Sequence, residues 1–463
     1  MEEGFSFVDS PDLLDPRLVD HLSWGASLMD HTGDGLPDLF VGGHYNRSYV
    51  YRNQCGSFTL DRQMDQNWGR SDRHNCAWGE ANGDGLLDLV CARGGQRSRG
   101  GLPSELWIQD QDGTFTDQAA EFGIEDTTSR TRTVSWIDYD ADGDLDLFFA
   151  SHWRADSPNQ LFRNDSGYFS LVEIGLEDHF GSEGAVWSDW NRDGYPDLIV
   201  TAKTTSTVAY LNQRGHFFSR TTIPKLTGRR WLGATFADLN GDGWPDLHVV
   251  KDGKALLFLN DHGKLTGERA QKMERGRMSV AFDADNDSDL DLFVVRGAGE
   301  EATPNRPDRS DILLVNSGGS FHRIKIGGHS GNGDSAAAAD WDRDGDIDIF
   351  VTNGYRKVKG PFQPFVNRSA TGNWAGVYLE GGPTNPMGFG ARMRVRAGRR
   401  SYWREQNDGV GYRSQSETGY FHLGLDRART ATVKVVWPDG TTSCGIVPGS
   451  STITLHQNSD TCP

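Results

Sequence analysis

Oxygen-bearing side chains recur at fixed positions of a nine-residue segment. The copies are DHTGDGLPD from Asp30, EANGDGLLD from Glu80, DYDADGDLD from Asp138, DWNRDGYPD from Asp189, DLNGDGWPD from Asp238, DADNDSDLD from Asp283 and DWDRDGDID from Asp340. Calcium takes roughly six to eight oxygen ligands, and side chains at positions 1, 3, 5 and 9 with the carbonyl at position 7 would supply most of them. The spacing therefore predicts up to seven structural Ca²⁺ ions.

The predicted side-chain ligands are the residues at those four positions of each copy. They are Asp30, Thr32, Asp34 and Asp38; Glu80, Asn82, Asp84 and Asp88; Asp138, Asp140, Asp142 and Asp146; Asp189, Asn191, Asp193 and Asp197; Asp238, Asn240, Asp242 and Asp246; Asp283, Asp285, Asp287 and Asp291; and Asp340, Asp342, Asp344 and Asp348. Two copies are weaker candidates, because Thr32 stands at position 3 of the first and Ser288 replaces glycine at position 6 of the sixth.

The acidity of the chain is concentrated in these segments. Asp-Gly and Asn-Gly pairs also mark ordinary hairpin turns, but seven copies with matched oxygen positions favour metal binding. The chain has a formal charge of −18, and without the 24 carboxylates at the predicted ligand positions the charge would be +6. Without a cation, each loop would hold three or four mutually repelling carboxylates.

The copies begin 45 to 58 residues apart, which is the length of a propeller blade of four short strands. Apolar runs such as Val134–Ile137 and Leu147–Ala150 flank each loop, so the pattern is strand, tight loop, strand. A second recurring element, exemplified by Tyr51-Arg-Asn and Phe258-Leu-Asn, marks the third strand and its turn. Seven loops predict seven blades, and the opening Phe5–Val8 resembles an outer strand that would complete the last blade.

The loops and flanking strands resemble the FG-GAP and VCBS repeats of integrin α-chain propellers. The tail resembles the ASPIC/UnbV domain, through Gly411-Tyr412-Arg413-Ser414-Gln415, His422-Leu-Gly424-Leu425 and Val433-Lys-Val-Val-Trp437-Pro-Asp-Gly440. The combination is similar to the cartilage acidic protein 1 and bacterial UnbV family, some members of which are found with enediyne biosynthesis genes. The resemblance implies an all-β fold: a calcium-binding seven-bladed propeller over residues 1–370 and a small β-sandwich or barrel over residues 371–463.

An arginine-rich stripe crosses the tail. It comprises Arg392, Arg394, Arg396, Arg399, Arg400 and Arg404, on alternating apolar and polar segments that predict strands. Three interpretations are open: a solvated strand face, a dock for the acidic propeller, or an anion site.

Ligands of propellers usually bind in a funnel on the face opposite the first hairpins. Cationic and aromatic residues predicted to gather there are Arg73, His74, Arg132, Trp153, Arg154, Arg230, Trp231, Arg277 and Tyr355. Arg beside Trp or Tyr suits an anionic or aromatic ligand, which would be a small molecule, a glycan or a protein.

Two functions follow. The first is a non-catalytic, calcium-stabilised binding module. The alternative is an enzyme of natural-product biosynthesis or a polysaccharide lyase, with His152, Tyr45, Arg154 and His74 as candidate catalytic residues. The acidic charge disfavours nucleic acid, and no apolar run approaches the roughly 20 residues of a membrane span.

The cellular compartment has two interpretations. The first residues lack a secretory leader, so the chain is either cytosolic or the mature form of an extracellular or periplasmic protein. Five cysteines leave at least one thiol unpaired, and Cys444 with Cys462 could form a disulfide in an exported protein.

Overall fold

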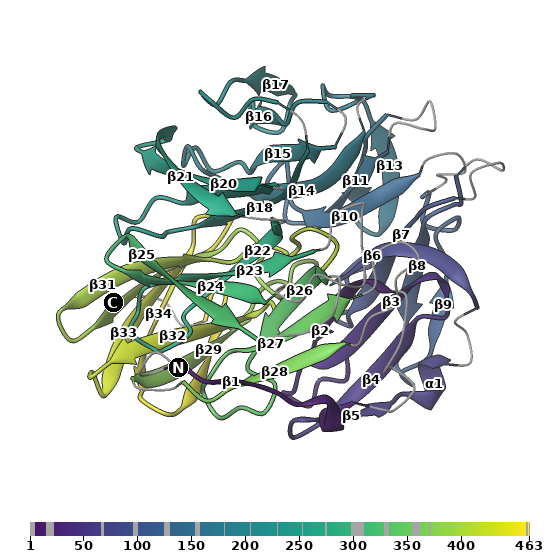
Figure 1. The fold of residues 1–463 in the computed structure, drawn as a ribbon. Helices are drawn as coiled ribbons and strands as arrows, with labels where there is room; N and C mark the ends of the chain where they lie inside the picture. The colour runs from purple at the N-terminus through teal and green to yellow at the C-terminus, as the bar shows by residue number, and fades with distance from the viewer. Residues whose placement is uncertain are drawn as a thin grey trace, which may run out of the picture.

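The computed structural model describes residues 5–14, 23–65, 69–95, 101–124, 130–152, 158–179, 181–203, 205–228, 230–251, 253–273, 276–297, 310–327, 333–353, 362–369, 372–459 and 462. The fold is all-β. It consists of a ring of antiparallel blades and two further sheets at the C-terminal end of the chain (Figure 1).

Seven four-stranded units form the ring, with the first strand of each unit at the centre. The units are β2 (Ser23–Met29), β3 (Asp38–Asn46), β4 (Tyr49–Gln54), β5 (Ser57–Leu60); β6 (Ser71–Gly79), β7 (Asp88–Arg93), β8 (Glu105–Gln109), β9 (Phe115–Asp117); β10 (Thr131–Ile137), β11 (Asp146–Ser151), β12 (Gln160–Asp165), β13 (Tyr168–Val172); β14 (Ser182–Ser188), β15 (Asp197–Ala202), β16 (Val208–Asn212), β17 (Phe218–Thr221); β18 (Trp231–Ala237), β19 (Asp246–Lys251), β20 (Gly253–Asp261), β21 (Lys264–Met273); β22 (Gly276–Phe282), β23 (Asp291–Arg296), β24 (Asp311–Ser317), β25 (Ser320–Ile326); and β26 (Gly333–Ala339), β27 (Asp348–Asn353), β28 (Gln363–Asn367), β1 (Phe7–Asp9). We number these blades one to seven. Blades one and two share an eight-stranded sheet because β3 extends to pair with β6. Two short helical segments, η1 (Pro11–Leu13) and α1 (Arg62–Asp65), lie outside the sheets.

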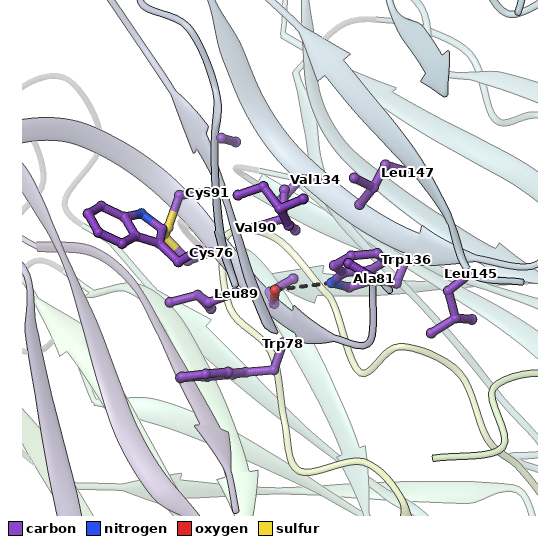
Figure 2. Close-up of a cluster of buried hydrophobic side chains, with 14 of the residues drawn as sticks. Cys76, Trp78, Ala81, Leu89, Val90, Cys91, Val134, Trp136, Leu145 and Leu147 are labelled. Atoms are coloured by element: carbon purple, nitrogen blue, oxygen red, sulfur yellow. Dashed lines mark hydrogen bonds between the residues drawn. A yellow bond between two sulfur atoms is a disulfide. The ribbon is translucent and has the colours of Figure 1, made fainter. Parts of the chain in front are cut away.

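Hydrophobic cores lie between adjacent blades, because a single four-stranded blade cannot bury both of its faces. Between blades two and three, Trp78 and Val90 pack near Trp136 and Leu147, and the Trp136 indole N–H donates to the Ala77 carbonyl at 3.1 Å (Figure 2). The inner strands are buried on both faces, so β10 and β14 are buried throughout, whereas the outer strand β13 is partly exposed.

The chain ends of the propeller meet in blade seven, where β1 pairs antiparallel with β28 and Phe7 lies opposite Asn367. Phe5 and Phe7 pack against the core between blades six and seven. We expect deletion of residues 1–9 to lower the melting temperature (Tm) by several degrees in differential scanning calorimetry, since it removes the fourth strand and part of that core. Deletion of residues 1–4 alone is the control. An equal Tm for the two truncated proteins would contradict a closing role for β1.

Seven strands form two sheets at the C-terminal end. They are β29 (Asn373–Glu380), β30 (Arg392–Ala397), β31 (Arg400–Glu405), β32 (Tyr420–Asp426), β33 (Thr430–Val436), β34 (Thr442–Pro448) and β35 (Thr452–His456), in the orders β32-β29-β35 and β31-β30-β33-β34. Their inner faces share a core that includes Val377, Leu423, Met393 and Val433. We call this unit the C-terminal β domain.

Two disulfides are present. Cys444 pairs with Cys462, and Cys76 pairs with Cys91 across the neighbouring strands β6 and β7, while the exposed Cys55 is a free thiol. Figure 2 shows the Cys76–Cys91 bridge beside the core between blades two and three. The Cys76–Cys91 pair was not predicted, because only the register of β6 and β7 brings these two cysteines together. Among the described residues, no helix is long and apolar enough to cross a membrane.

Candidate functional site

The seven acidic loops share one backbone shape. Positions 4 and 6 have positive φ in every copy, and three of the position-4 residues, Ala141, Arg192 and Arg343, are not glycine or asparagine. Ser288, at position 6 of the sixth loop, adopts the same conformation with φ 84°. A residue with a side chain is sterically disfavoured at positive φ. The loop therefore adopts the same backbone shape even where the residue at position 4 or 6 does not favour it.

Carboxylates of each loop converge on its interior. In the third loop Asp138 accepts hydrogen bonds from the N–H groups of Asp142 and Gly143 at 3.2 Å, and ligand oxygens of Asp138, Asp140 and Asp146 lie within 4.8 Å of one another. The same spacing holds for Asp283, Asp285 and Asp291 and for Asp340, Asp342 and Asp344.

Several of these oxygens are buried without a hydrogen-bond partner. Such atoms include Glu80 Oε2, Asp140 Oδ1, Asp197 Oδ2, Asp340 Oδ1 and Asp348 Oδ2. Burial raises the pKa of Asp138 and Asp283 to about 7 and that of Asp340 to about 8. A buried anion without a counter-charge is costly, so the residues present fit a hard cation with oxygen ligands.

The aspartate at position 9 has a second role. Its Oδ1 accepts the backbone N–H of a third-strand residue in all seven blades, at 2.7–2.9 Å. That residue is the asparagine of the second repeated motif, or Gln109 in blade two, and its side-chain amide donates to the loop carbonyl of the preceding blade at 2.7–3.3 Å. The motif therefore ties neighbouring blades together around the ring.

The first loop differs from the others in charge. His31 Nδ1 lies 2.7 Å from Asp38 Oδ2, and the ring stacks on Trp78. A protonated imidazole at this distance would supply Asp38 with a positive charge without a metal.

The C-terminal β domain lies on the face formed by the acidic loops. Contacts to the position-6 residues include the Tyr378 hydroxyl with Gly35 O at 3.3 Å, Thr384 with Gly143 O at 2.7 Å, and Ser288 with Gly424 O at 3.0 Å.

Half of the arginine stripe takes part in this docking. Arg400 pairs with Asp289 at 3.1 Å, and Arg404 donates to Ser288 O at 3.0 Å. Arg392 and Arg404 also line a cavity of about 240 Å³ together with Asp189 and Asp238. Arg396 and Arg399 are exposed, so the stripe is a dock at one end and a solvated face at the other.

Residues 408–418 of the C-terminal β domain enter the central channel of the propeller; we call this segment the plug. Gln415 pairs through its backbone with β2, donating to Ala26 O at 3.0 Å and accepting from Leu28 N at 3.1 Å, while its side chain bonds to both backbone groups of Trp78. Glu417 N donates to Ala338 O of blade seven. Gly25 leaves room for the plug, because a Cβ there would overlap the Arg413 carbonyl oxygen.

Asp408, at the start of the plug, is a buried carboxylate whose Oδ1 accepts the Val410 N–H at 3.1 Å. Burial raises the pKa of Asp408 to about 7. Since an unfolded aspartate titrates near pH 4, the folded state takes up a proton as the pH falls through 7, so this residue destabilises the protein above pH 7 and progressively less between pH 7 and 4.

The Asp408→Asn protein should therefore have a higher Tm than the wild type at pH 8, by an amount corresponding to roughly 4 kcal/mol. At pH 5 the difference should shrink toward zero. Thermal melts at the two pH values check this expectation, and an unchanged difference between pH 5 and 8 would contradict it.

Each inner strand has a β-bulge at its far end, away from the acidic loops. The register shifts at the second residue of β2, β10, β14, β18, β22 and β26 and at the fourth residue of β6. A bulge re-aims the side chain it carries. We define the bulge ring as one residue from each of these shifts: Trp24, His74, Arg132, Glu183, Leu232, Arg277 and Asp334.

Arg413, from the plug, completes an ion cluster with this ring. Its guanidinium contacts Glu183 at 3.1 Å and Asp334 at 3.3 Å, and all three side chains are at most 3% exposed. Burial alone would raise the pKa of Glu183, but Arg132 and Arg413 hold it at about 2. The cluster thus joins blade three, blade four, blade seven and the C-terminal β domain.

Histidines surround the blade-two side of the ring. Asp72 lies 2.7 Å from His44 Nδ1 and 3.1 Å from His74 Nε2. Burial and the charge of Arg132 lower the pKa of His74 to about 4 and that of His152 to about 3, so both imidazoles are neutral at pH 7. Neutral imidazoles beside carboxylates and guanidinium groups can accept protons or bind a metal.

The rim residues predicted from the sequence have different environments. His74, Arg132 and Arg277 belong to the bulge ring, and His152 lies 3.6 Å from Glu183 of that ring. Arg73 is buried in an ion pair with Glu105 at 2.6 Å.

The remaining predicted residues do not join the cluster in the described part of the chain. Trp231 is buried in the core between blades four and five, and Arg230 is exposed. Trp153, Arg154, Tyr355 and the side chain of Tyr45 lie outside the described residues. Sequence reasoning missed Asp72, Asp334 and Arg413, of which only Arg413 stood in a recognised motif.

Comparisons with known proteins agree with this architecture. The FG-GAP-like repeat model matches residues 30–91, 80–149, 138–200, 189–249, 238–294 and 283–351, and the ASPIC and UnbV model matches residues 381–461. Among solved structures, BBS1N in complex with ARL6DN is similar, with a TM-score of 0.52 and 8% identity over 78% of this chain and 97% of that one. This likeness supports the propeller fold alone.

Curated relatives are cartilage acidic protein 1 of Mus musculus, 24% identical over 390 residues, and of Homo sapiens, 26% identical over 390 residues. The alignments cover 79% of this chain but 49% and 48% of those proteins, so the chain spans about half the length of the curated relatives it matches. With six repeat matches spanning the propeller and a separate match over the C-terminal β domain, the chain belongs to the family of FG-GAP-like repeat proteins that carry an ASPIC and UnbV domain.

Proposed function

We propose that the chain is a calcium-stabilised propeller that binds a small anionic or aromatic ligand at the bulge ring, on the face opposite the acidic loops. The observation that carries this proposal is the bulge ring itself. Five of its seven positions hold ionisable residues, although the inner strands are the most buried part of the propeller. Charged groups are costly there, so a role in recognition accounts for them better than packing does.

The two faces of the propeller have different roles in this proposal. The C-terminal β domain covers the acidic loops, which we assign as structural Ca²⁺ sites, and its plug closes the channel from that side. We place the boundary between the two domains near residue 370. The two disulfides favour an oxidising compartment, so we propose that the protein acts outside the cytosol, in the extracellular space or periplasm.

Benzoate, which is both anionic and aromatic, together with acetate, glucuronate and inorganic phosphate, can serve as probes of the ring. We expect at least one of them to bind the calcium-loaded protein in isothermal titration, with affinity falling at least about 10-fold in Arg132→Met and Arg277→Met proteins. Arg396→Met, which removes an exposed arginine of the C-terminal β domain, is the matched control. Equal affinity in all variants, or no binding by any probe, would refute the anionic and aromatic assignment.

A second candidate function is catalysis at the same ring. It is favoured by the two neutral imidazoles, His74 and His152, which lie beside Asp72 and Glu183 at 3.1 and 3.6 Å. Such groups can act as general bases at neutral pH. Because some family members occur with enediyne biosynthesis genes, cyclisation of a small molecule is one reaction to assay, and cleavage of a polysaccharide by a lyase reaction is the other. Binding without chemical change of the ligand would distinguish a binding module from an enzyme.

A further inference from the structure

We infer that His44, Asp72 and His74 bind one divalent transition-metal cation of the Zn²⁺ class, at a site distinct from the acidic loops. Two imidazole nitrogens and one carboxylate form a donor set suited to Zn²⁺ and Fe²⁺, whereas Ca²⁺ prefers oxygen alone. The three ligand atoms lie within 4.8 Å of one another, which is compatible with a shared ion.

The orientation of His74 makes its Nε2 the metal-binding atom. Its Nδ1 lies 2.8 Å from the carbonyl oxygen of Thr131, which can only accept, so Nδ1 carries the proton. In the neutral ring Nε2 then has a lone pair, and this lone pair faces Asp72 Oδ1 at 3.1 Å. Two acceptors at that distance repel each other, and a metal ion bound to both would replace the repulsion by attraction. A backbone carbonyl that orients the other ring nitrogen is also the usual outer partner of a metal-bound histidine.

The second oxygen of Asp72 provides an independent observation. Asp72 Oδ2 has no hydrogen-bond partner, and its side chain is 1% exposed. Gly94 borders this oxygen and His74 Nε2, and a Cβ on that glycine would overlap both. The buried, unpartnered oxygen and the small residue beside it leave a cradle for an ion. His44, at 14% exposure of its side chain, is the point at which an ion reaches the site from solvent.

The positive charge of Arg132 opposes metal binding, so replacing Arg132 provides a further test of the site. Its Nη1 is 3.0 Å from His74 Nδ1 and 2.8 Å from Nε2. Both contacts are within hydrogen-bond distance, so the guanidinium competes with a metal ion for Nε2. The like charge and the contact with Nε2 both oppose metal binding, so Arg132→Met should bind the metal more tightly than the wild type.

The test uses tag-free protein whose acidic loops are saturated with millimolar Ca²⁺, titrated with Co²⁺ and Zn²⁺. We expect one Co²⁺ per chain, with visible d–d absorption, displaced by Zn²⁺. His44→Ala and Asp72→Asn should weaken binding by more than about 100-fold. His262→Ala is the matched control, because His262 and Asp261 form an exposed pair of similar length, 2.8 Å.

A glycine pair tests the cradle without removing a ligand. Gly94→Ala should abolish Co²⁺ binding, whereas Gly69→Ala, where a Cβ meets nothing within 4 Å, should preserve it. Metal affinities are compared only for variants whose calcium-loaded Tm stays near that of the wild type. If Asp72→Asn and Gly94→Ala do not fold, the Co²⁺ affinity of His44→Ala decides whether the site exists. Absence of a bound ion in the wild type, or full binding by His44→Ala, would overturn the inference. The measurement needs no organic ligand, so its failure leaves the proposed function standing.

Discussion

Chelation of calcium should lower the Tm of this protein by more than about 10 °C, because the acidic loops bury several carboxylate oxygens that have no hydrogen-bond partner among the described residues. Ligand binding at about 100 times its dissociation constant stabilises a protein by roughly 2.7 kcal/mol per site, and several such sites add up to that shift in Tm. Loop three, which has four carboxylates at the predicted ligand positions and glycine at position 6, should contribute most.

Calorimetry before and after treatment with EGTA measures the effect. Returning Ca²⁺ should restore the Tm, and Mg²⁺ should restore little of it, since Mg²⁺ requires a smaller octahedral site. A matched pair of variants, Asp140→Asn in the third loop and Asp112→Asn in an exposed turn, separates loop chemistry from general loss of charge. A melting curve insensitive to EGTA would show that the hydrogen bonds of the loops suffice without metal.

Replacing Arg413 with methionine should cost about 3–5 kcal/mol of stability, because it leaves Glu183 and Asp334 buried without their shared cation. Methionine keeps much of the volume of the side chain, so the loss reports on charge rather than on packing. Urea denaturation followed by tryptophan fluorescence should show a lower midpoint, and limited proteolysis should release the C-terminal β domain at lower urea concentrations than in the wild type.

A triple variant, Arg413→Met with Glu183→Gln and Asp334→Asn, tests whether the uncompensated charges cause the loss of stability. Removing all three charges should recover a large part of the lost stability, because the uncompensated anions are then absent. Arg396→Met should change nothing measurable. If Arg413→Met alone matches the wild type, the plug is held by the backbone bonds of Gln415 and Glu417 and the ion cluster contributes little.

The acidic loops and the blade count could be predicted because their signals are local. Nine-residue segments with alternating oxygen donors repeat along the chain, and apolar runs on either side set the strands. The asparagine of the third strand was visible as a repeat, but its bond to the preceding blade was not, because that partner lies 70 to 83 residues away in blades three to seven.

The sequence by itself determined the repeat, the oxygen donors and the basic residues that precede the inner strands. Only the tertiary structure decided that β-bulges aim His74, Arg132, Glu183 and Asp334 at the channel, that Arg413 reaches them from the other domain, and that the C-terminal β domain covers the acidic loops. Arg413 and Glu183 are 230 residues apart in the chain. No local pattern encodes a contact of that span, because it depends on how seven blades close into a ring and on what fills the centre.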